Sequence, residues 1–275
     1  MEKVETINNK QKRSRIFKLD LIRGICMLLV IFDHLMYDIA YMMSDIFLDY
    51  PGTNKIMGSI VDFCRWYWHS NIRFHVRNVA VFLFLCLIGI CCSLTKNNLK
   101  RGAKLFIGAM IISLVTFIAG LVTNDLEITI TFGILHCASL TLIIIGLLEK
   151  TTQNKWIYWG IAIVMIITGL YFYKDAPYAY YESSTIWEVV SGLFLGTKNY
   201  GSDCMPFLLY GGQIFAGVFI GKVLYTKKES LFKKEYKNNI VTFIGRHSLM
   251  TYLIHQGTVI VLLALILLIC GYKVG

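Results

Sequence analysis

Charged residues are scarce in this sequence: Asp, Glu, Lys and Arg make up only 16% of its 275 residues, against roughly 25% in an ordinary soluble domain. Apolar residues make up 56%, and they occur in unbroken runs rather than at scattered periodic positions. This composition excludes a soluble enzyme, a disordered tail and a disulfide-stapled secreted domain. It predicts an all-α integral membrane protein that crosses the bilayer several times.

Several signatures of soluble function are also missing. No glycine-rich loop is followed by Lys and Ser or Thr, no nucleophile elbow occurs, and no spacing suggests a zinc site, so we expect no bound metal. The glycerolipid acyltransferase box, His with Asp five residues later, is not met, because His34 and Asp38 are four apart. No small-residue cleavage site follows the apolar stretch that ends at Phe32, which predicts a retained first helix.

The eight cysteines do not form a disulfide framework. Six of them fall inside apolar runs, where cysteine behaves as a small apolar residue. Only Cys64 and Cys204 lie in or beside predicted outer loops. We expect two free thiols there, with one bridge between them as the alternative.

Six uncharged runs predict transmembrane helices, and the length of each is near the ~17–25 residues that a bilayer requires. These runs are Val79–Thr95, Leu105–Asn124, Ile128–Leu148, Trp156–Tyr173, Cys204–Gly221 and Ser248–Tyr272. A seventh predicted span, Ile16–Ile39, carries charges at both ends. Ile186–Thr197 is apolar but too short to span, and we interpret it as re-entrant or interfacial.

With seven spans, about three quarters of the Lys and Arg residues fall on one side of the membrane. Because cytoplasmic loops carry an excess of Lys and Arg, this side is predicted to be cytoplasmic, with the N-terminus inside and the C-terminus outside. The protein is accordingly predicted to be a multi-pass protein of the cytoplasmic membrane. The net charge of +10 then reflects topology and anionic lipids, not a nucleic-acid partner. Residues 1–15 are predicted to be a disordered cytoplasmic N-terminus, and residues 16–272 one polytopic domain. Within the inner loop Lys222–Arg246, the run from Lys227-Lys228-Glu229 through Lys237 is interpreted as a solvated anchor. The aromatic outer loop Ala40–Asn78 is interpreted as an amphipathic interfacial segment.

The first helix carries five ionisable residues inside a predicted span. Four of them share one narrow stripe at 100° per residue, and the fifth lies to the side: Asp20, Arg23, His34 and Asp38, with Asp33 apart. Arg23 and His34 are about 16–17 Å apart along the axis at ~1.5 Å per residue. Since ionisable groups in a bilayer are costly, the stripe predicts a water-accessible track inside the bundle that connects the two leaflets.

Each polar residue also has a structural interpretation. Asp20 and Arg23 are spaced for an ion pair within the helix. His34 has Asp38 one turn further on, which is the orienting acceptor that a general base needs. His136 is predicted at about the depth of His34, and His255 shares a helix face with Tyr252 and Gln256, but a buried structural histidine explains either one as well.

Motifs in order along the chain point to a known family. They are Leu19-Asp20-Leu21-Ile22-Arg23-Gly24 with His34 and Tyr37-Asp38, Asn98-Leu99-Lys100-Arg101-Gly102, Phe132-Gly133-Ile134-Leu135-His136, and Phe243-Ile244-Gly245-Arg246-His247-Ser248-Leu249 with Tyr252-Leu253-Ile254-His255-Gln256. Together they resemble bacterial relatives of the heparan-alpha-glucosaminide N-acetyltransferase catalytic domain family, within the wider group of transmembrane acyltransferases. The resemblance implies transfer of an acetyl or other acyl group from cytoplasmic acyl-CoA to a sugar or other cell-envelope acceptor outside.

The resemblance also implies residue roles. Arg23, with Asp20 and Arg101, would hold acyl-CoA. His34, oriented by Asp38, would deprotonate the acceptor or carry the acyl group, and His136 would stabilise the oxyanion. The acyl-carrying histidine of lysosomal members lies in the first luminal loop, and His69 occupies a comparable loop here, so the sequence leaves open which histidine acts.

Two other functions remain alternatives. Intramembrane Asp, His and Arg also mark ion pathways, so a proton-coupled transporter is one, and a non-enzymatic membrane sensor or partner is the other. The partners expected are membrane lipids, acyl-CoA, a glycan-like outer acceptor and, as a further candidate, a second copy of the chain. The sequence does not reveal the acceptor, the acyl length or N- versus O-transfer.

Overall fold

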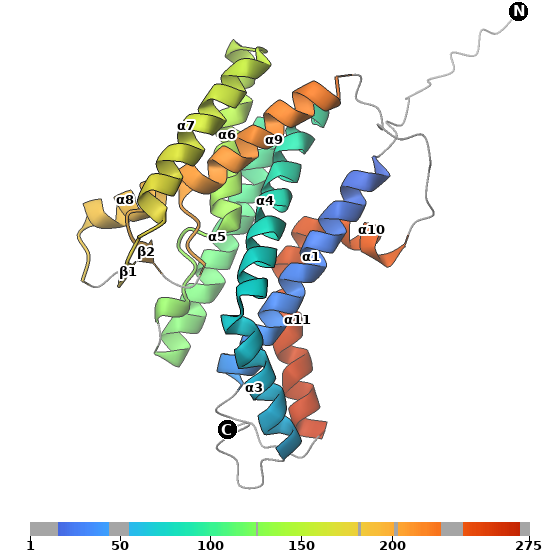
Figure 1. The fold of residues 1–275 in the computed structure, drawn as a ribbon, viewed down its shortest axis with the longest axis vertical. Helices are drawn as coiled ribbons and strands as arrows, with labels where there is room; N and C mark the ends of the chain where they lie inside the picture. The colour runs from blue at the N-terminus through green and yellow to red at the C-terminus, as the bar shows by residue number, and fades with distance from the viewer. Residues whose placement is uncertain are drawn as a thin grey trace, which may run out of the picture.

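The computed structural model describes residues 16–43, 55–124, 126–180, 183–200, 203–226 and 239–269; the predicted disordered segment 1–15 lies outside them. Helices make up nearly all of the described chain (Figure 1). They are α1 (Phe17–Tyr37), the π-helical turn η1 (Asp38–Met42), α3 (Lys55–His69), α4 (Asn71–Leu94), α5 (Asn98–Thr123), the 3-10 turn η2 (Leu126–Ile128), α6 (Ile134–Thr151), α7 (Lys155–Tyr173), α8 (Ile186–Leu195), α9 (Phe207–Leu224), α10 (Ile240–Arg246) and α11 (Ser248–Ile269). A short parallel pair joins β1 (Tyr178–Ala179) to β2 (Asn199–Tyr200).

Six of these helices, α4, α5, α6, α7, α9 and α11, are long and apolar enough to cross a membrane. The predicted all-α membrane protein is therefore confirmed. Helix α1 has 21 residues and is also long enough, but it carries charge. Its polar residues face the protein, and its opposite face exposes Ile25, Leu29 and Phe32, as a surface in contact with lipid would.

Helix boundaries differ from the predicted spans where charged residues flank an apolar run. Helices α4 and α5 begin eight and seven residues earlier than the uncharged runs. Each is capped by the residue before it: Ser70 Oγ accepts the N–H of Arg73, and the Asn97 side chain accepts that of Lys100. Hydropathy marks only the segment within hydrocarbon, while a charged side chain at a helix end reaches the aqueous interface.

Helix α6 begins six residues later than predicted. The segment before it is not helical, because its backbone bonds to hydroxyls on α5. Ser113 Oγ donates to the Ile130 carbonyl at 2.6 Å, and the Ile130 N–H donates to Thr116 Oγ1 at 3.0 Å. These two bonds fix an extended approach to α6 that hydropathy alone does not reveal.

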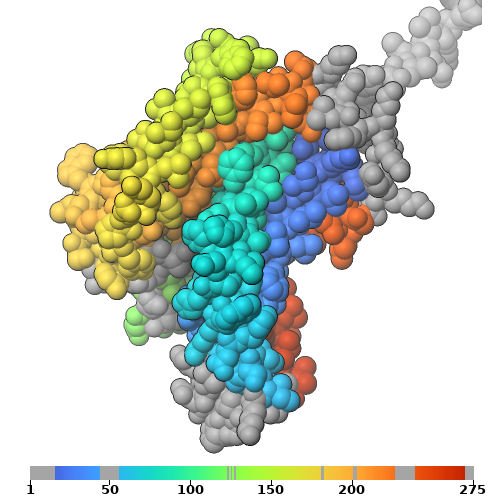
Figure 2. Space-filling model, in the orientation of Figure 1, coloured from blue at the N-terminus to red at the C-terminus, as the bar shows by residue number. Residues whose placement is uncertain are grey.

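The bundle is assembled from closely packed helix pairs: α7 and α4 each pack against α9, α5 against α6, and α1 against α10 and α4 (Figure 1). Figure 2 shows α4 lying between α9 and α1 on one face of the bundle. Glycines permit the closest crossings. A Cβ added at Gly217 of α9 would collide with the Cys86 carbonyl of α4, and one added at Gly89 of α4 would collide with the Ile214 carbonyl of α9. The two backbones are in direct contact there, as small residues allow in membrane proteins.

The solvated anchor predicted at Lys227 to Lys237 lies outside the described residues. The end of the same predicted loop is not a loop, because residues 240–246 form the helix α10, which packs on α1. Gly24 of α1 abuts the Val241 carbonyl, and Gly245 of α10 abuts the Asp20 carbonyl. Because neither glycine has a Cβ, the short helix lies directly against the N-terminal half of α1.

Helix α3 is amphipathic, as predicted for the first outer loop, and one face packs into the protein. Val61 lies fully buried with Met43 and with Val259, Leu263 and Leu267 of α11. In Figure 1, α3 runs beside the lower part of α11. The outer loop therefore ends in a helix that extends the bundle.

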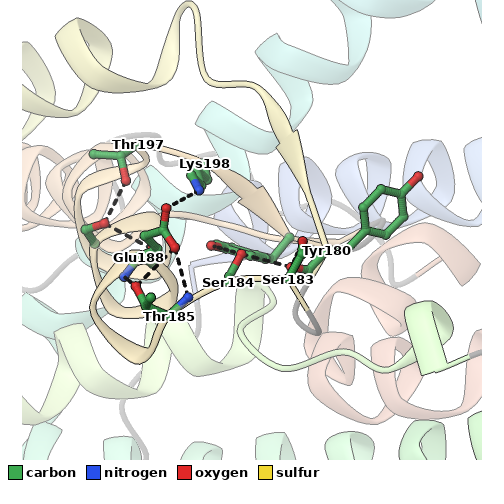
Figure 3. A network of polar contacts seen from close by, with 9 residues as sticks. Tyr180, Ser183, Ser184, Thr185, Glu188, Thr197 and Lys198 are labelled. Atoms are coloured by element: carbon green, nitrogen blue, oxygen red, sulfur yellow. Dashed lines mark hydrogen bonds and ion pairs between the residues drawn. The ribbon is translucent and has the colours of Figure 1, made fainter.

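Helix α8 has ten residues, too few to span, in agreement with the prediction from its length. Thr185 and Glu188 form a capping box at its start, and Lys198 donates to Glu188 Oε1 at 2.6 Å (Figure 3). The hydrogen bonds from Lys198 and from the backbone of Thr185 lower the pKa of Glu188 to about 2. This polar network fixes the exposed connection between α7 and α9.

Candidate active site

The inner part of the α1 stripe is an ion-pair network. Arg23 Nη1 lies 3.3 Å from Asp20 Oδ1 and 3.3 Å from the Gly245 carbonyl, and Arg246 Nε lies 3.3 Å from Asp20 Oδ2. Arg23 Nη2 donates to Cys91 Sγ of α4 at 2.7 Å. The ion pair considered from sequence is therefore confirmed, and it joins α1, α10 and α4.

Arg101, on α5, lies further along the same end of the bundle. Its Nη1 lies 3.5 Å from the Ile88 carbonyl and 4.0 Å from Cys92 Sγ, both on α4. Arg23 and Arg101 thus contact the adjacent residues Cys91 and Cys92 and approach one segment of α4. They do not contact each other in the described contacts.

A cavity of about 880 Å³ opens beside this segment, among the ends of α4, α5, α6, α7 and α9 that the sequence predicts to be cytoplasmic. We call it the inner cavity. Four lysines line it, Lys96, Lys150, Lys155 and Lys222, together with Cys92, Asn98 and Glu149. The sequence assigns all four lysines to the cytoplasmic side, but it does not reveal that their loops enclose a common space.

The outer part of the stripe contacts α11. The His34 and His255 rings meet edge to face, with centroids 4.9 Å apart. Asp38 is fully buried, and Gln256 Nε2 donates to both of its carboxylate oxygens at 2.9 and 3.0 Å. The predicted pairing of Asp38 with His34 is therefore not the arrangement found: Asp38 binds α11 instead.

Asp203 and Arg77, from two further parts of the chain, complete this region together with Tyr252 of α11. The Tyr252 hydroxyl of α11 hydrogen-bonds the Asp203 carboxylate, which lies in the segment before α9, and the Tyr252 ring lies 5.4 Å from that of His255. Arg77 of α4 interacts electrostatically with both Asp203 and His34. We call His34, His255, Tyr252, Asp203 and Arg77 the outer histidine cluster.

The predicted shared face of Tyr252, His255 and Gln256 is confirmed, because each contacts a polar group of the site. Asp203 and Arg77 were not among the predicted site residues. Asp203 follows a short strand and lies in a polar segment, and Arg77 lies just before an uncharged apolar run. Only the packing of α4, α9 and α11 brings them to His34, so no local pattern marks them.

Replacing Asp203 by asparagine is expected to change how stability depends on pH. Burial raises the pKa of Asp203 from 3.8 to about 6, so the carboxyl ionises more easily in the unfolded chain. The native chain binds more protons between these values, and stability therefore falls as pH rises from about 4 to about 6. The melting temperature of the wild type minus that of Asp203→Asn should decline over this interval and level off above it. If the difference in melting temperature between the two proteins does not change with pH, the Asp203 carboxyl is solvated in the folded protein and the expectation is wrong.

His136 lies in a separate hydrogen-bonded arrangement at the start of α6. Its Nε2 lies 3.0 Å from Ser113 Oγ, and its Nδ1 accepts the Gly133 N–H at 3.3 Å. Because the Ser113 proton is directed to the Ile130 carbonyl, Nε2 carries the imidazole proton and both ring nitrogens are engaged. The nearest link to the outer cluster is Asp203, whose carboxylate lies 2.9 Å from the position of a Cβ added at Gly133.

Asp33 points away from the stripe, as predicted. Arg73 of α4 donates to both of its oxygens, at 2.8 and 2.7 Å, and stacks over Trp68 at 3.4 Å from the ring centroid. His69, the other candidate histidine, lies 2.9 Å from the Tyr41 hydroxyl. These contacts join α1 to α3 and α4. Cys64 and Cys204 are free thiols.

The predicted continuous track along α1 is wrong for this structure. Met27 lies between Arg23 and His34 on the same side of the helix, is fully buried and belongs to the main hydrophobic core. Sulfur and methylene groups thus separate the inner ion pairs from the outer histidine cluster. A helical wheel shows which residues share a direction, but not which apolar side chain fills the space between them.

The fold and the two polar regions define a polytopic membrane protein with a basic cavity at one end of its bundle and a histidine cluster toward the other. A family model described as "Heparan-alpha-glucosaminide N-acetyltransferase, catalytic" matches residues 59–257. The chain belongs to this family of membrane acetyltransferases, which confirms the resemblance found in its sequence. The match contains Arg77, Asp203, Tyr252 and His255 and begins after α1. Searches of curated proteins and of solved structures returned no match.

Proposed function

We propose that this membrane acetyltransferase takes an acetyl or other acyl group from acyl-CoA on the cytoplasmic side and delivers it to a sugar or other cell-envelope acceptor outside. In this proposal α1 is a seventh span, the N-terminus is cytoplasmic and the C-terminus is outside. The strongest support is the placement of two polar sites on one bundle: the inner cavity joins loops rich in lysine, and the outer histidine cluster lies further along α1 and α4.

The inner cavity suits the phosphate-bearing part of acyl-CoA. Lysines provide positive charge for phosphate groups, and four of them line a space of about 880 Å³. Arg23 and Arg101 contact Cys91 and Cys92 behind the wall of this space. They strengthen the positive potential there without binding phosphate directly, and Asp20 holds Arg23 and Arg246 in place.

The long, thin acyl-bearing arm of the donor would extend from this cavity toward His34. Cys92, at the cavity, and Arg77, at the outer cluster, are 15 residues apart on α4, or about 22 Å at ~1.5 Å per residue. Met27 lies across the corresponding stretch of α1. An unbranched side chain with three rotatable bonds is well suited to move aside when the arm enters.

At the outer cluster, His34 acts as the general base. It takes the proton of the acceptor amine or hydroxyl while the acceptor lone pair attacks the thioester carbonyl. A C–N or C–O bond forms, the C–S bond breaks, and the departing CoA thiolate takes the proton from His34. Arg77 is placed to stabilise the negative charge on the carbonyl oxygen. Asp38, at the end of α1, ties that helix to α11 through Gln256. His136 accepts the Gly133 N–H and so holds Gly133 beside Asp203.

Reversing one cavity charge is expected to weaken donor binding. Lys222 lies in the cavity wall, with Nζ 3.2 Å from Gln153 Oε1 and 4.8 Å from the centre of the Tyr158 ring. The variant Lys222→Glu places a carboxylate near the CoA phosphates, and we expect at least a tenfold increase in the Kd of acetyl-CoA, a loss of about 1.4 kcal/mol. Calorimetric titration of the purified protein measures this.

The matched control is Lys174→Glu, which reverses the charge of an exposed lysine that pairs only with Asp175 in the described contacts. Its affinity for acetyl-CoA should equal that of the wild type. Equal weakening in both variants would mean that the donor responds to net charge alone and not to the cavity.

The function itself is tested with protein reconstituted in vesicles, using radiolabelled acetyl-CoA on the lysine-rich side and glucosamine as the probe acceptor on the other. Label should appear on glucosamine only with the protein. Mass spectrometry of cell-envelope glycans from cells with and without the protein then identifies the natural acceptor. If acetyl-CoA does not bind at saturating concentration, the acyltransferase proposal is wrong and a carrier or sensor is favoured.

A further inference from the structure

His255 has an orientation fixed by its own helix. Its Nδ1 lies 2.7 Å from the backbone carbonyl of Tyr252. A carbonyl only accepts hydrogen bonds, so Nδ1 carries the proton of the neutral ring and Nε2 keeps a lone pair. The residue is buried, with 7% of its surface exposed, and Nε2 makes no hydrogen bond.

This unpartnered nitrogen lies on the side of the ring away from the α11 backbone, because Nδ1 is directed back to that backbone. The neighbour on α1 is His34, whose ring contacts that of His255 at 4.9 Å and 63°. His34 is half-buried, whereas His255 is buried, so His34 is the more accessible of the two rings. A buried lone pair without a donor is costly, which calls for a function or a partner at this position.

The other acceptors nearby are engaged. Both oxygens of Asp38 accept hydrogen bonds from Gln256, those of Asp33 accept from Arg73, and Asp203 binds Tyr252. Gln256 Oε1 is also buried without a partner, but the Gln256 amide is directed to Asp38. Among the described residues with an unused acceptor atom, His255 is the one whose ring contacts the ring of His34.

We propose that His255 is a positioning residue for His34, and that the two form a histidine dyad in which His255 Nε2 accepts the N–H of His34. The proposal rests on the function proposed above. It assigns to a neutral histidine the role that an aspartate has in other dyads. With one His34 nitrogen held as a donor, the other keeps its lone pair toward the acceptor substrate. The hydrogen bond forms when the substrate tightens the site, since catalytic hydrogen bonds are often long before substrate binds.

The dyad explains three contacts at once. The Tyr252 carbonyl fixes the tautomer of His255. Gln256, the next residue of α11, binds Asp38 at the end of α1, and α1 and α11 thereby hold the two rings in contact. The imidazolium that forms on His34 during transfer is stabilised because its second N–H has an acceptor.

The test compares two variants of His255 in the full-length protein. In His255→Gln the amide oxygen accepts a hydrogen bond, whereas in His255→Phe the ring is similar in size but has no acceptor. For acetyl transfer to glucosamine we expect His255→Phe to lower kcat about 100-fold with KM for acetyl-CoA within twofold of wild type. His255→Gln should remain within tenfold of wild type. If His255→Phe does not fold, His255→Leu replaces it. The exposed His75 provides the control His75→Phe, with unchanged kinetics.

A second measurement does not depend on transferase activity. Diethyl pyrocarbonate reacts with the lone pair of a neutral imidazole, and mass spectrometry gives the rate of modification at His34. This rate should fall at least fivefold in His255→Phe and stay near wild type in His255→Gln. Equal loss of activity in both variants with unchanged His34 labelling would overturn the dyad and leave the proposed function standing. The labelling pattern without any transfer would instead support the dyad and refute the transferase.

Discussion

Replacing His34 by alanine is expected to lower the rate of acyl transfer about a thousandfold while the protein still folds. A general base contributes 10²–10⁴-fold to a reaction of this kind, and no other residue of the outer histidine cluster combines an accessible ring with an acceptor behind it. His34 is half-buried, so its replacement removes its contact with the His255 ring but creates no fully enclosed cavity. Initial rates with radiolabelled acetyl-CoA measure the effect, and the melting temperature shows that the fold is retained.

The control for this variant is His75→Ala, an exposed histidine on α4 whose described ring contact is with Phe74. It should be as active as the wild type. Full activity in His34→Ala would move the chemistry to His69 or His136. The contacts of these two histidines with Tyr41 and with Ser113 would then have to open during the reaction.

Replacing Gly217 by alanine is expected to destabilise the bundle severely. The new methyl group would collide with the Cys86 backbone carbonyl of α4, and backbone cannot rotate away as a side chain does. Alanine favours the helix by about 1 kcal/mol over glycine, but overpacking costs up to about 3 kcal/mol. The cost of pushing α4 away from α9 therefore exceeds the gain in helix propensity, and the net change in stability is a loss. We expect a large fall in melting temperature in detergent and loss of a single size-exclusion peak.

Gly160→Ala is the matched control, since Gly160 also lies within a helix and has nothing within 4 Å of the added methyl group. Its melting temperature should equal or slightly exceed that of the wild type. If Gly217→Ala behaves in the same way, the α4–α9 crossing has room to adjust and its glycines serve another purpose.

The sequence predicted the fold class and the helices because a bilayer selects long apolar segments, which hydropathy detects directly. It placed their ends poorly, because caps such as Ser70 and hydroxyl contacts such as Ser113 with Ile130 determine where a helix begins. It also missed the packing of α10, since the contact of Gly24 with Val241 joins residues far apart in the chain.

For the site, patterns within one helix were informative and relations between helices were not. The α1 stripe faces the protein, and Tyr252, His255 and Gln256 share a face, as helical geometry requires. The partners of these residues were missed, because Asp38 binds Gln256 and Asp203 reaches Tyr252 only after α9 and α11 are assembled. The role of each site residue remains a prediction for the kinetic tests above.

Met27 has a consequence for the cell as a whole. A protein that conveys an activated acyl group between compartments must not become a leak for protons, since even a thin water wire would discharge the electrochemical gradient. In the reaction proposed above, the buried Met27 thioether would act as electrical insulation between the two polar regions, and proton leakage would be restricted to the moments when a donor molecule occupies the bundle.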